Sequence, residues 1–213
     1  MTLPEYLNEY FSSGEQGLFE DKPVDLVTHF LEKFGVDVKK ENDLFQFKYN
    51  MLVVRWCFPI THECRGIILR YDGNWKVVAR PWGKFFNLGE NMSPLTDDSV
   101  FEKHVDEFQL RSKEDGTGIQ VWFDDITGQW RASTLGTITP LPVDGFSDVT
   151  FADLFWRTFG EDAKAKLNEY GNKDYTYLFE LCCYQNRIVT KYPDNRIYLL
   201  GIRHKISGVY LPM

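Results

Sequence analysis

The residues of this sequence that could do chemistry begin with Lys113, which opens the segment KEDGTGIQVW at 113–122. A neutral lysine amine is a nucleophile, but an unperturbed one with a pKa of about 10.4 is neutral in only about one molecule in 2,500 at pH 7. Desolvation and nearby positive charge both favour the neutral amine. A reactive Lys113 therefore needs cationic neighbours, whereas a solvated turn would explain the same segment without chemistry.

Three other segments could supply those neighbours: ECRGIILR at 63–70, ARPWGKFFNLGE at 79–90 and LFELCCYQNRIV at 178–189. Arg65 and Lys84 could bind phosphate oxygens, Arg65 through its planar fork and Lys84 as a point charge. Each could also be a long side chain lying along a sheet face. Gly116 has no Cβ, so the backbone there could approach a ligand closely. Phe86 could pack under a nucleotide base or fill the core.

Two carboxylates, Asp115 and Glu180, lie among these basic residues. Carboxylates in a phosphate site usually hold a hard cation directly or through its waters, so Mg²⁺ (or Mn²⁺) is the expected metal. Glu180 lies in the apolar run LFELCC, where an unpaired carboxylate would be costly. A purely structural salt bridge therefore remains an alternative for Glu180.

In order and approximate spacing, the four segments resemble the motifs of the covalent nucleotidyltransferases, which include ATP-dependent ligases and mRNA capping enzymes. The segments ECRGI, RPWGKFFN, KEDG and FELCCYQNRIV are similar to those of the RNA ligase 1 type found in phages. The resemblance covers about residues 45–205. Four ordered motifs identify a family far more specifically than K-x-D-G alone.

The resemblance implies an ATP-dependent RNA ligase in which Lys113 is the catalytic nucleophile. Lys113 would attack the α-phosphate of ATP, form lysyl-AMP and release pyrophosphate. The AMP would pass to an RNA 5′-phosphate, and an RNA 3′-hydroxyl would then displace it. The residues implied to bind the nucleotide are Arg65, Lys84, Phe86, Glu114, Asp115, Gly116 and Glu180. Asp115 and Glu180 are the expected metal ligands, although the family also allows Glu180 to contact the ribose.

The chain from Tyr177 onward is locally basic, with five Lys and Arg against two acidic residues. Phosphate contacts are electrostatic, so an RNA backbone is expected there. The candidate RNA-binding residues are Arg187, Lys191 and Arg203.

The sequence departs from the family pattern at two places. Leu135 stands where the family carries a basic residue just before a Gly-Ser pair. The sequence stops at Met213, before the family's E-G strand and its last lysine-bearing strand. A truncated form, strands supplied by a second chain, and a degenerate relative each explain that end. The alternative functions are therefore a catalytically impaired nucleotide-binding relative and a DNA ligase or capping-type nucleotidyltransferase.

The elements that must position these residues are mostly hairpins. Asp72-Gly73 and Thr127-Gly128 are turn signals within strand-like runs at 65–81 and 118–135. Pro193–Asn195 is expected to turn a third hairpin within 177–204. Hairpins with interspersed helices favour an α+β fold with antiparallel sheets. The resemblance adds the architecture of a ligase adenylation domain, here a single nucleotidyltransferase domain over 1–213 that is incomplete at its C-terminus.

Helices are expected at three places. Residues 23–35 have helical apolar spacing, with Pro23 near the start and Gly35 as the stop. A second helix is expected over 151–170, with Thr150 as N-cap, Asp153 as the capping-box acid and Gly171 as the stop. A shorter helix is expected over 98–108.

Composition excludes several classes of protein. A net charge of −7 and a pI near 5.2 argue against coating nucleic acid by bulk charge. The four cysteines make no C-x-x-C pair, which predicts neither a zinc site nor a disulfide framework. The chain lacks a signal-peptide start and an apolar run that could span a bilayer. We expect a soluble protein of the cytoplasm, the host cytoplasm if it is viral, with no membrane partner.

Overall fold

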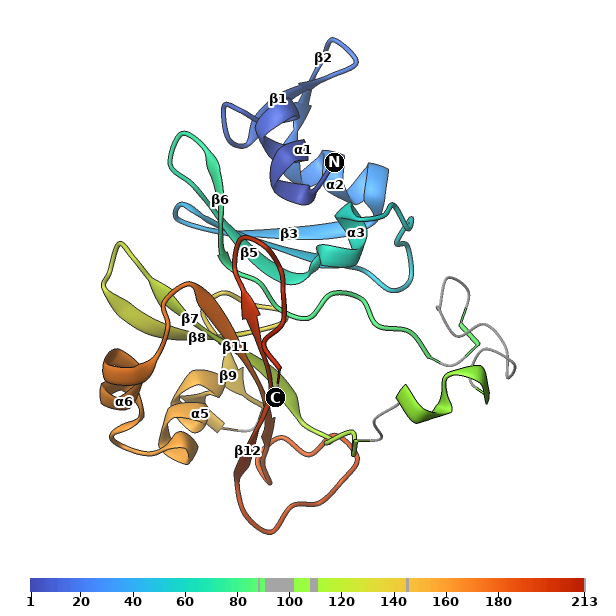
Figure 1. Ribbon diagram of the computed structural model, residues 1–213. Coiled ribbons are helices and arrows are strands. Elements are labelled where there is room, and N and C mark those ends of the chain that lie inside the picture. The colour runs from blue at the N-terminus through green and yellow to red at the C-terminus, as the bar shows by residue number, and fades with distance from the viewer. Residues whose placement is uncertain (88, 91–101, 108–110, 145, 213) are drawn as a thin grey trace.

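Two four-stranded antiparallel sheets form the centre of the protein in a computed structural model, which describes residues 1–212 except 88, 91–101, 108–110 and 145 (Figure 1). The first sheet has the order β3 (Val36–Glu41), β4 (Leu44–Tyr49), β5 (Arg65–Tyr71), β6 (Trp75–Ala79). The second has the order β12 (Arg196–His204), β11 (Tyr175–Cys182), β7 (Thr117–Asp124), β8 (Gln129–Thr134). The predicted α+β fold with antiparallel sheets is confirmed.

The two sheets pack on each other through their inner faces. Leu44 of β4, Ile68 of β5 and Trp122 of β7 are buried in one apolar cluster between the sheets. Alternate residues of a strand point to opposite faces, so each strand gives one set of side chains to this interface and the other set to the outside of its sheet. Burial of the inner set holds the sheets together and brings β5, β7 and β11 close enough to share one site.

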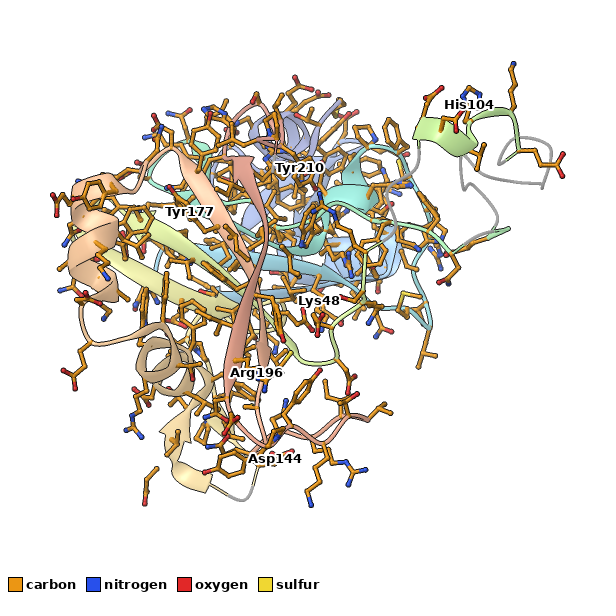
Figure 2. The ribbon with its side chains drawn as sticks, turned by 60° about the horizontal axis from the view of Figure 1, so that its bottom comes forward. Lys48, His104, Asp144, Tyr177, Arg196 and Tyr210 are labelled. Atoms are coloured by element: carbon orange, nitrogen blue, oxygen red, sulfur yellow. The ribbon has the colours of Figure 1, made fainter. Side chains whose placement is uncertain are left out.

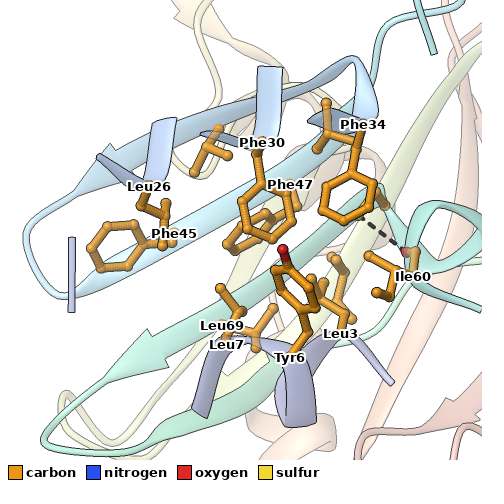
Figure 3. Packing of buried hydrophobic residues seen from close by; sticks show 14 of the residues in the cluster. Leu3, Tyr6, Leu7, Leu26, Phe30, Phe34, Phe45, Phe47, Ile60 and Leu69 are labelled. Carbon is orange, nitrogen blue, oxygen red and sulfur yellow. Dashed lines mark hydrogen bonds between the residues drawn. The ribbon is translucent and has the colours of Figure 1, made fainter. Parts of the chain in front are cut away.

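The N-terminal elements cover the outer face of the first sheet. Helices α1 (Leu3–Tyr10) and α2 (Leu26–Phe34), the hairpin of β1 (Gln16–Phe19) and β2 (Lys22–Asp25), and the short α3 (Ile60–Glu63) form this layer. Figure 3 shows Tyr6 and Phe30 of these helices packed on Phe47 and Leu69 of the sheet. This larger apolar cluster makes the first sheet a stable platform for the start of β5.

Helix α2 is shorter at its start than the expected 23–35. Asp25 is its N-cap, because its carboxylate accepts a hydrogen bond from Thr28 N at 2.9 Å. Pro23 instead pairs with Leu18 in the β1–β2 hairpin. The predicted stop is confirmed, since Gly35 caps the helix with φ +64°, a left-handed conformation that favours glycine.

Two helices cover the outer face of the second sheet, where one was expected over 151–170. They are α5 (Phe151–Phe159) and α6 (Ala163–Tyr170), preceded by the small sheet of β9 (Pro142–Val143) and β10 (Phe146–Thr150). Gly160 ends α5 with φ +117°, which breaks the helix. The Thr150–Asp153 capping box and the stop at Gly171 are confirmed.

Two of the three expected hairpin turns are confirmed, at Gly73 (φ +97°) and Gly128 (φ +66°). The third is wrong in its tip. Cys182 pairs with Arg196, so residues 183–195 form one long loop and Pro193–Asn195 lie at its end. Residues 186–189 of the motif that ends NRIV are therefore loop rather than strand. Of the helix expected over 98–108, residues 98–101 and 108 lie outside the described residues, and Val105–Glu107 is a 3-10 helix.

The cysteines are free thiols, and Cys64, Cys182 and Cys183 are buried while Cys57 is exposed. Burial raises the pKa of each buried thiol. Within the part of the chain that the structure describes, no helix is both long and apolar enough to cross a membrane.

Candidate active site

A cavity of about 380 Å³ opens where the inner faces of the two sheets diverge, beside the start of β5 and β7. Its walls come from β5, β7, β11 and β12 and from the segments around residues 82–85, 112–116 and 135. The charged residues of the lining are Arg65, Lys113, Glu114 and Glu180. Charged side chains from three of the four expected motifs thus line one cavity. Its volume is in the range that small-molecule ligands occupy.

Lys113 and Glu180 face each other across this cavity. Lys113 is exposed, four residues before β7 begins, and Glu180 projects from β11 opposite Gly118. Glu180 Oε1 accepts a hydrogen bond from Gly116 N at 3.1 Å, which ties the loop after Lys113 to β11. Burial raises the pKa of Glu180, while the Gly116 hydrogen bond and the positive charge of Lys113 act in the opposite direction. The carboxylate and the amine thus belong to the same cavity wall.

Gly116 is required by a close approach to β11. A Cβ at this position would lie 2.4 Å from the carbonyl oxygen of Leu181, far inside van der Waals contact. Any side chain would push the 113–116 loop away from β11 and stretch the hydrogen bond to Glu180. The position of Lys113 relative to Glu180 therefore depends on Gly116.

Arg65, the first residue of β5, brings the second positive charge into the cavity. Its guanidinium carbon lies 3.8 Å from the centre of the Phe85 ring, a cation–π arrangement that orients the planar fork. Its Nη1 donates a long hydrogen bond to Gly83 O at 3.4 Å. Burial lowers the pKa of Arg65, and the neighbouring Tyr49 partly offsets that shift. Arg65 therefore presents its guanidinium group to the cavity beside the Phe85 ring.

Lys84 and Phe86 lie beside the cavity rather than in its wall. The Lys84 side chain is buried, with Nζ 2.8 Å from Glu90 Oε1 and 4.5 Å from the centre of the Phe86 ring. The hydrogen bond from Lys84 lowers the pKa of Glu90. Phe85 lines the cavity instead. The structure therefore does not bring Lys84 and Phe86 together with Lys113.

Asp115 points away from the cavity and holds the 183–195 loop. Its Oδ2 accepts hydrogen bonds from Thr190 N at 2.6 Å and Val189 N at 2.8 Å, and these hydrogen bonds lower the pKa of Asp115. Its backbone N donates to Tyr192 Oη at 3.1 Å. Asp115 is thus a loop anchor, which explains why the loop between β11 and β12 folds back towards Lys113.

The acidic residues fit a divalent cation only in part. Among the described residues, no group of three or more His, Cys, Asp and Glu side chains could hold a metal. Asp115 is not in the cavity wall, and two backbone N–H groups occupy its Oδ2. Glu180 and Glu114 both line the cavity. Mg²⁺ usually keeps several waters and takes one or two carboxylates together with phosphate oxygens, and this pair of side chains fits that requirement.

The expected RNA-binding residues separate into two groups. Arg187 and Lys191 are exposed on the 183–195 loop. Arg203 is buried, with Nη2 2.9 Å from Glu63 Oε1 and Nη1 donating to Pro81 O at 2.5 Å. Arg203 therefore belongs to an interior network and is not a surface contact for RNA.

Several residues of the cavity wall were not anticipated, namely Trp82, Phe85 and Leu200. Trp82 packs so closely on β12 that a Cβ at Gly201 would lie 2.4 Å from its ring, and it stacks on Tyr210 with ring centres 4.9 Å apart. In the sequence, the one feature that could have indicated this role is that Trp82 and Phe85 flank Gly83 within one expected motif. Leu135 also lines the cavity, so this part of its wall carries no charge.

Comparison of the sequence with known proteins shows the family of this chain. The family model described as RNA ligase matches residues 63–211. The chain is 31% identical over 222 residues to an RNA ligase of Rhodothermus phage RM378, covering 93% of this chain and 48% of the relative. It is 28% identical over 158 residues to RNA ligase 1 of bacteriophage TS2126, covering 72% and 37%. The chain spans about half the length of these curated relatives, or less.

A solved structure confirms the architecture. The fold matches that of an archaeal ATP-dependent RNA ligase with a TM-score of 0.54 and 15% sequence identity, covering 87% of this chain and 44% of that one. The expected nucleotidyltransferase architecture is therefore confirmed at the level of the fold.

Proposed function

This chain belongs to the RNA ligase family, and from that premise we propose that it is the adenylation unit of an ATP-dependent RNA ligase with Lys113 as its nucleophile. One observation carries the proposal: Lys113, Arg65 and Glu180, from three distant segments, line the same cavity. We also propose that residues 1–213 act as one nucleotidyltransferase unit, because the two sheets share a buried interface. Its work on RNA and ATP would take place in the cytoplasm, that of the host if the chain is viral.

In the first step, Lys113 Nζ, having lost a proton to solvent, would form a bond to the α-phosphorus of ATP. The bond between that phosphorus and the oxygen bridging to the β-phosphate would break, and pyrophosphate would leave. Arg65 suits the phosphate oxygens, because its planar fork can donate two parallel hydrogen bonds. The Phe85 ring holds that fork at the cavity mouth. The apolar side chains of Ile119 and Leu178 in the cavity wall lower the local dielectric constant. This strengthens the attraction between Arg65 and the phosphate and the contact between Arg65 and the Phe85 ring.

The remaining lining suits the other parts of the nucleotide. Trp82, Phe85 and Leu200 offer aromatic and aliphatic surface for a base. Glu180, together with Glu114, would hold Mg²⁺ with water and phosphate oxygens, or Glu180 would accept a hydrogen bond from the ribose. A bound Mg²⁺ would neutralise phosphate charge during transfer. For Lys84 to reach a phosphate, its ion pair with Glu90 must open.

In the second step, an oxygen of an RNA 5′-phosphate would attack the phosphorus of lysyl-AMP, and Lys113 Nζ would leave. In the third, an RNA 3′-hydroxyl would displace AMP and seal the strand. Arg187 and Lys191 are exposed on the loop that Asp115 anchors. Their position supports contacts with the RNA backbone near Lys113.

A second candidate is a nucleotide-binding relative that does not react. The Lys84–Glu90 ion pair and the apolar Leu135 in the cavity wall favour it, because both reduce the positive charge available to a triphosphate. This version predicts reversible ATP binding, measurable by calorimetry, without a covalent adduct.

Incubation with Mg²⁺ and ATP radiolabelled at its α-phosphate separates the two candidates. The wild-type protein should keep the label through denaturing electrophoresis, and acid should release it, as expected for a phosphorus–nitrogen bond. Lys113→Ala should take up no label. An unlabelled wild type that still binds ATP would favour the second candidate. RNA and DNA acceptors, with ATP and GTP as donors, would then test the substrate class.

A further inference from the structure

A second cavity, of about 490 Å³, adjoins the first and has no role in the account above. It lies over β3, the end of β4 and the turn at Gly136. The two cavities share a wall: Lys48 in this one is the register partner of Arg65 in the other, and Gly136 follows Leu135. A ligand in the second cavity would therefore lie directly beside the site of Lys113.

Along the inner face of β4, the side chains change from apolar through polar to charged as the strand approaches this cavity. Leu44 is buried in the inter-sheet cluster, Gln46 follows on the same face and is 1% exposed, and Lys48 comes last and is exposed. The alternation of a strand places all three on one line. Lys48, labelled in Figure 2, is the last of the three and lines the second cavity.

Two amines gather at Gly136. Lys39 Nζ donates to Gly136 O at 2.7 Å. Lys48 Nζ lies 3.3 Å from the point where a Cβ on Gly136 would stand, and it has no hydrogen-bond or ion-pair partner among the described residues. Asp37 is the one carboxylate of the lining, and it forms no ion pair with either lysine in this part of the chain. Two amines against one carboxylate leave the cavity with a formal charge of +1.

The inner end of the cavity carries an unmet hydrogen-bond acceptor. Gln46 lines the cavity, its Nε2 donates to Thr134 O at 3.0 Å, and its Oε1 is buried without a partner. Buried polar atoms are normally paired, so an isolated acceptor indicates that a water or a ligand donor completes the site. The cavity therefore combines a cationic mouth with a polar floor.

We propose that this second cavity binds a phosphodiester of the RNA strand next to the phosphate that receives AMP, with Lys48 as its principal contact and Lys39 as a secondary one. The inference rests on the proposed function. Neighbouring strands lie about 4.8 Å apart, so a phosphodiester held by Lys48 on β4 would lie beside the nucleotide phosphate that Arg65 on β5 faces. A formal charge of +1 matches a single phosphodiester better than the multiply charged tail of ATP.

The salt dependence of RNA binding tests this inference. Each phosphate contact to single-stranded nucleic acid contributes about 0.7 to the slope of log affinity against log salt concentration. With a 5′-phosphorylated single-stranded RNA, Lys48→Ala should lower the magnitude of that slope by about 0.7 whatever the RNA sequence, and Lys48→Arg should restore it. Lys166→Ala, a matched change in an exposed ion pair on α6, should leave it unchanged. Asp37→Asn should tighten binding.

The rate of lysyl-AMP formation, measured on the same proteins, shows whether the phosphate bound in the second cavity belongs to RNA or to ATP. Because this step needs no RNA, its rate in Lys48→Ala should stay within about twofold of wild type. If Lys48→Ala failed to form lysyl-AMP while the wild type and Lys166→Ala formed it, the inference would be overturned and the cavity would be assigned to the triphosphate tail of ATP. An unchanged salt slope in Lys48→Ala, or no salt-dependent RNA binding by the wild type, would also overturn it. Absence of lysyl-AMP in the wild type would instead refute the proposed function.

Discussion

Removing the Glu63 carboxylate should destabilise the protein strongly, because it is the shared counter-ion of two buried arginines. Its Oε2 lies 2.9 Å from Arg80 Nη1 and its Oε1 lies 2.9 Å from Arg203 Nη2. The two arginine side chains are only 9% and 8% exposed. Burial lowers the pKa of Arg80, and the charge of Glu63 opposes that shift. Glu63→Ala would leave both guanidinium groups buried with no carboxylate beside them.

Breaking a buried ion pair by removing one partner costs about 3–5 kcal/mol. The Glu63 side chain is 18% exposed, so water can partly replace it, and the lower end of that range, about 3 kcal/mol, applies. For a chain of this size each kcal/mol shifts the melting temperature by roughly 2–4 °C. Glu63→Ala should therefore melt between about 6 and 12 °C below wild type.

Thermal unfolding followed by circular dichroism is the assay, with Asp72→Asn as the control. Asp72 pairs with Lys76 at 2.7 Å on the surface, and exposed pairs contribute only about 0–1 kcal/mol. Because Arg203 also holds Pro81 O, Glu63→Ala should slow lysyl-AMP formation even well below its melting temperature. A melting temperature for Glu63→Ala within about 2 °C of the control would refute this reasoning.

Three further changes test the site. Gly116→Ala should reduce lysyl-AMP formation by about 100-fold, the scale of a small misplacement of a reacting group, because a Cβ there meets the backbone of β11 and moves the loop away from Glu180; a rate within threefold of wild type would contradict it. Asp115→Ala should release the 183–195 loop, giving faster tryptic cleavage there at neutral pH than in wild type; since the pKa of Asp115 is lowered in the folded protein, the wild-type loop followed by amide hydrogen exchange should be fully ordered at neutral pH and lose order as the pH falls below the ordinary value of 3.8. Glu90→Gln should free Lys84 for phosphate and lower the KM for ATP, whereas an unchanged KM would show that Lys84 does not reach the nucleotide.

Local patterns were sufficient for much of the fold. Gly73 and Gly128 mark turns with positive φ, and the Thr150 capping box marks a helix start, because these features depend on residues only a few positions apart. Local spacing could not show that Gly160 breaks the second helix. Nor could it show that the loop after β11 is drawn back by Asp115, a residue about 75 positions earlier in the chain.

In the candidate site too, some features could be predicted from the sequence and others could not. The ordered motifs led to Arg65, Lys113 and Glu180, and all three line one cavity. The pairing of β7 with β11 brings the segments of Lys113 and Glu180 together, and Arg65 comes from the first sheet. The orientation of Phe85 against Phe86 could not be predicted, since the segment has no regular periodicity. Arg203 was expected on the surface because its partner, Glu63, lies 140 residues away. Lys48 could not be identified from the sequence, because it lies outside the motifs and its neighbours, β5 and Gly136, are brought beside it only by the fold.

Peptide mass spectrometry after incubation with ATP and Mg²⁺ tests the central claim most directly. One peptide should gain the mass of a single AMP, and fragmentation should place it on Lys113. An AMP adduct on another lysine, or an adduct that persists unchanged in Lys113→Ala, would contradict the account.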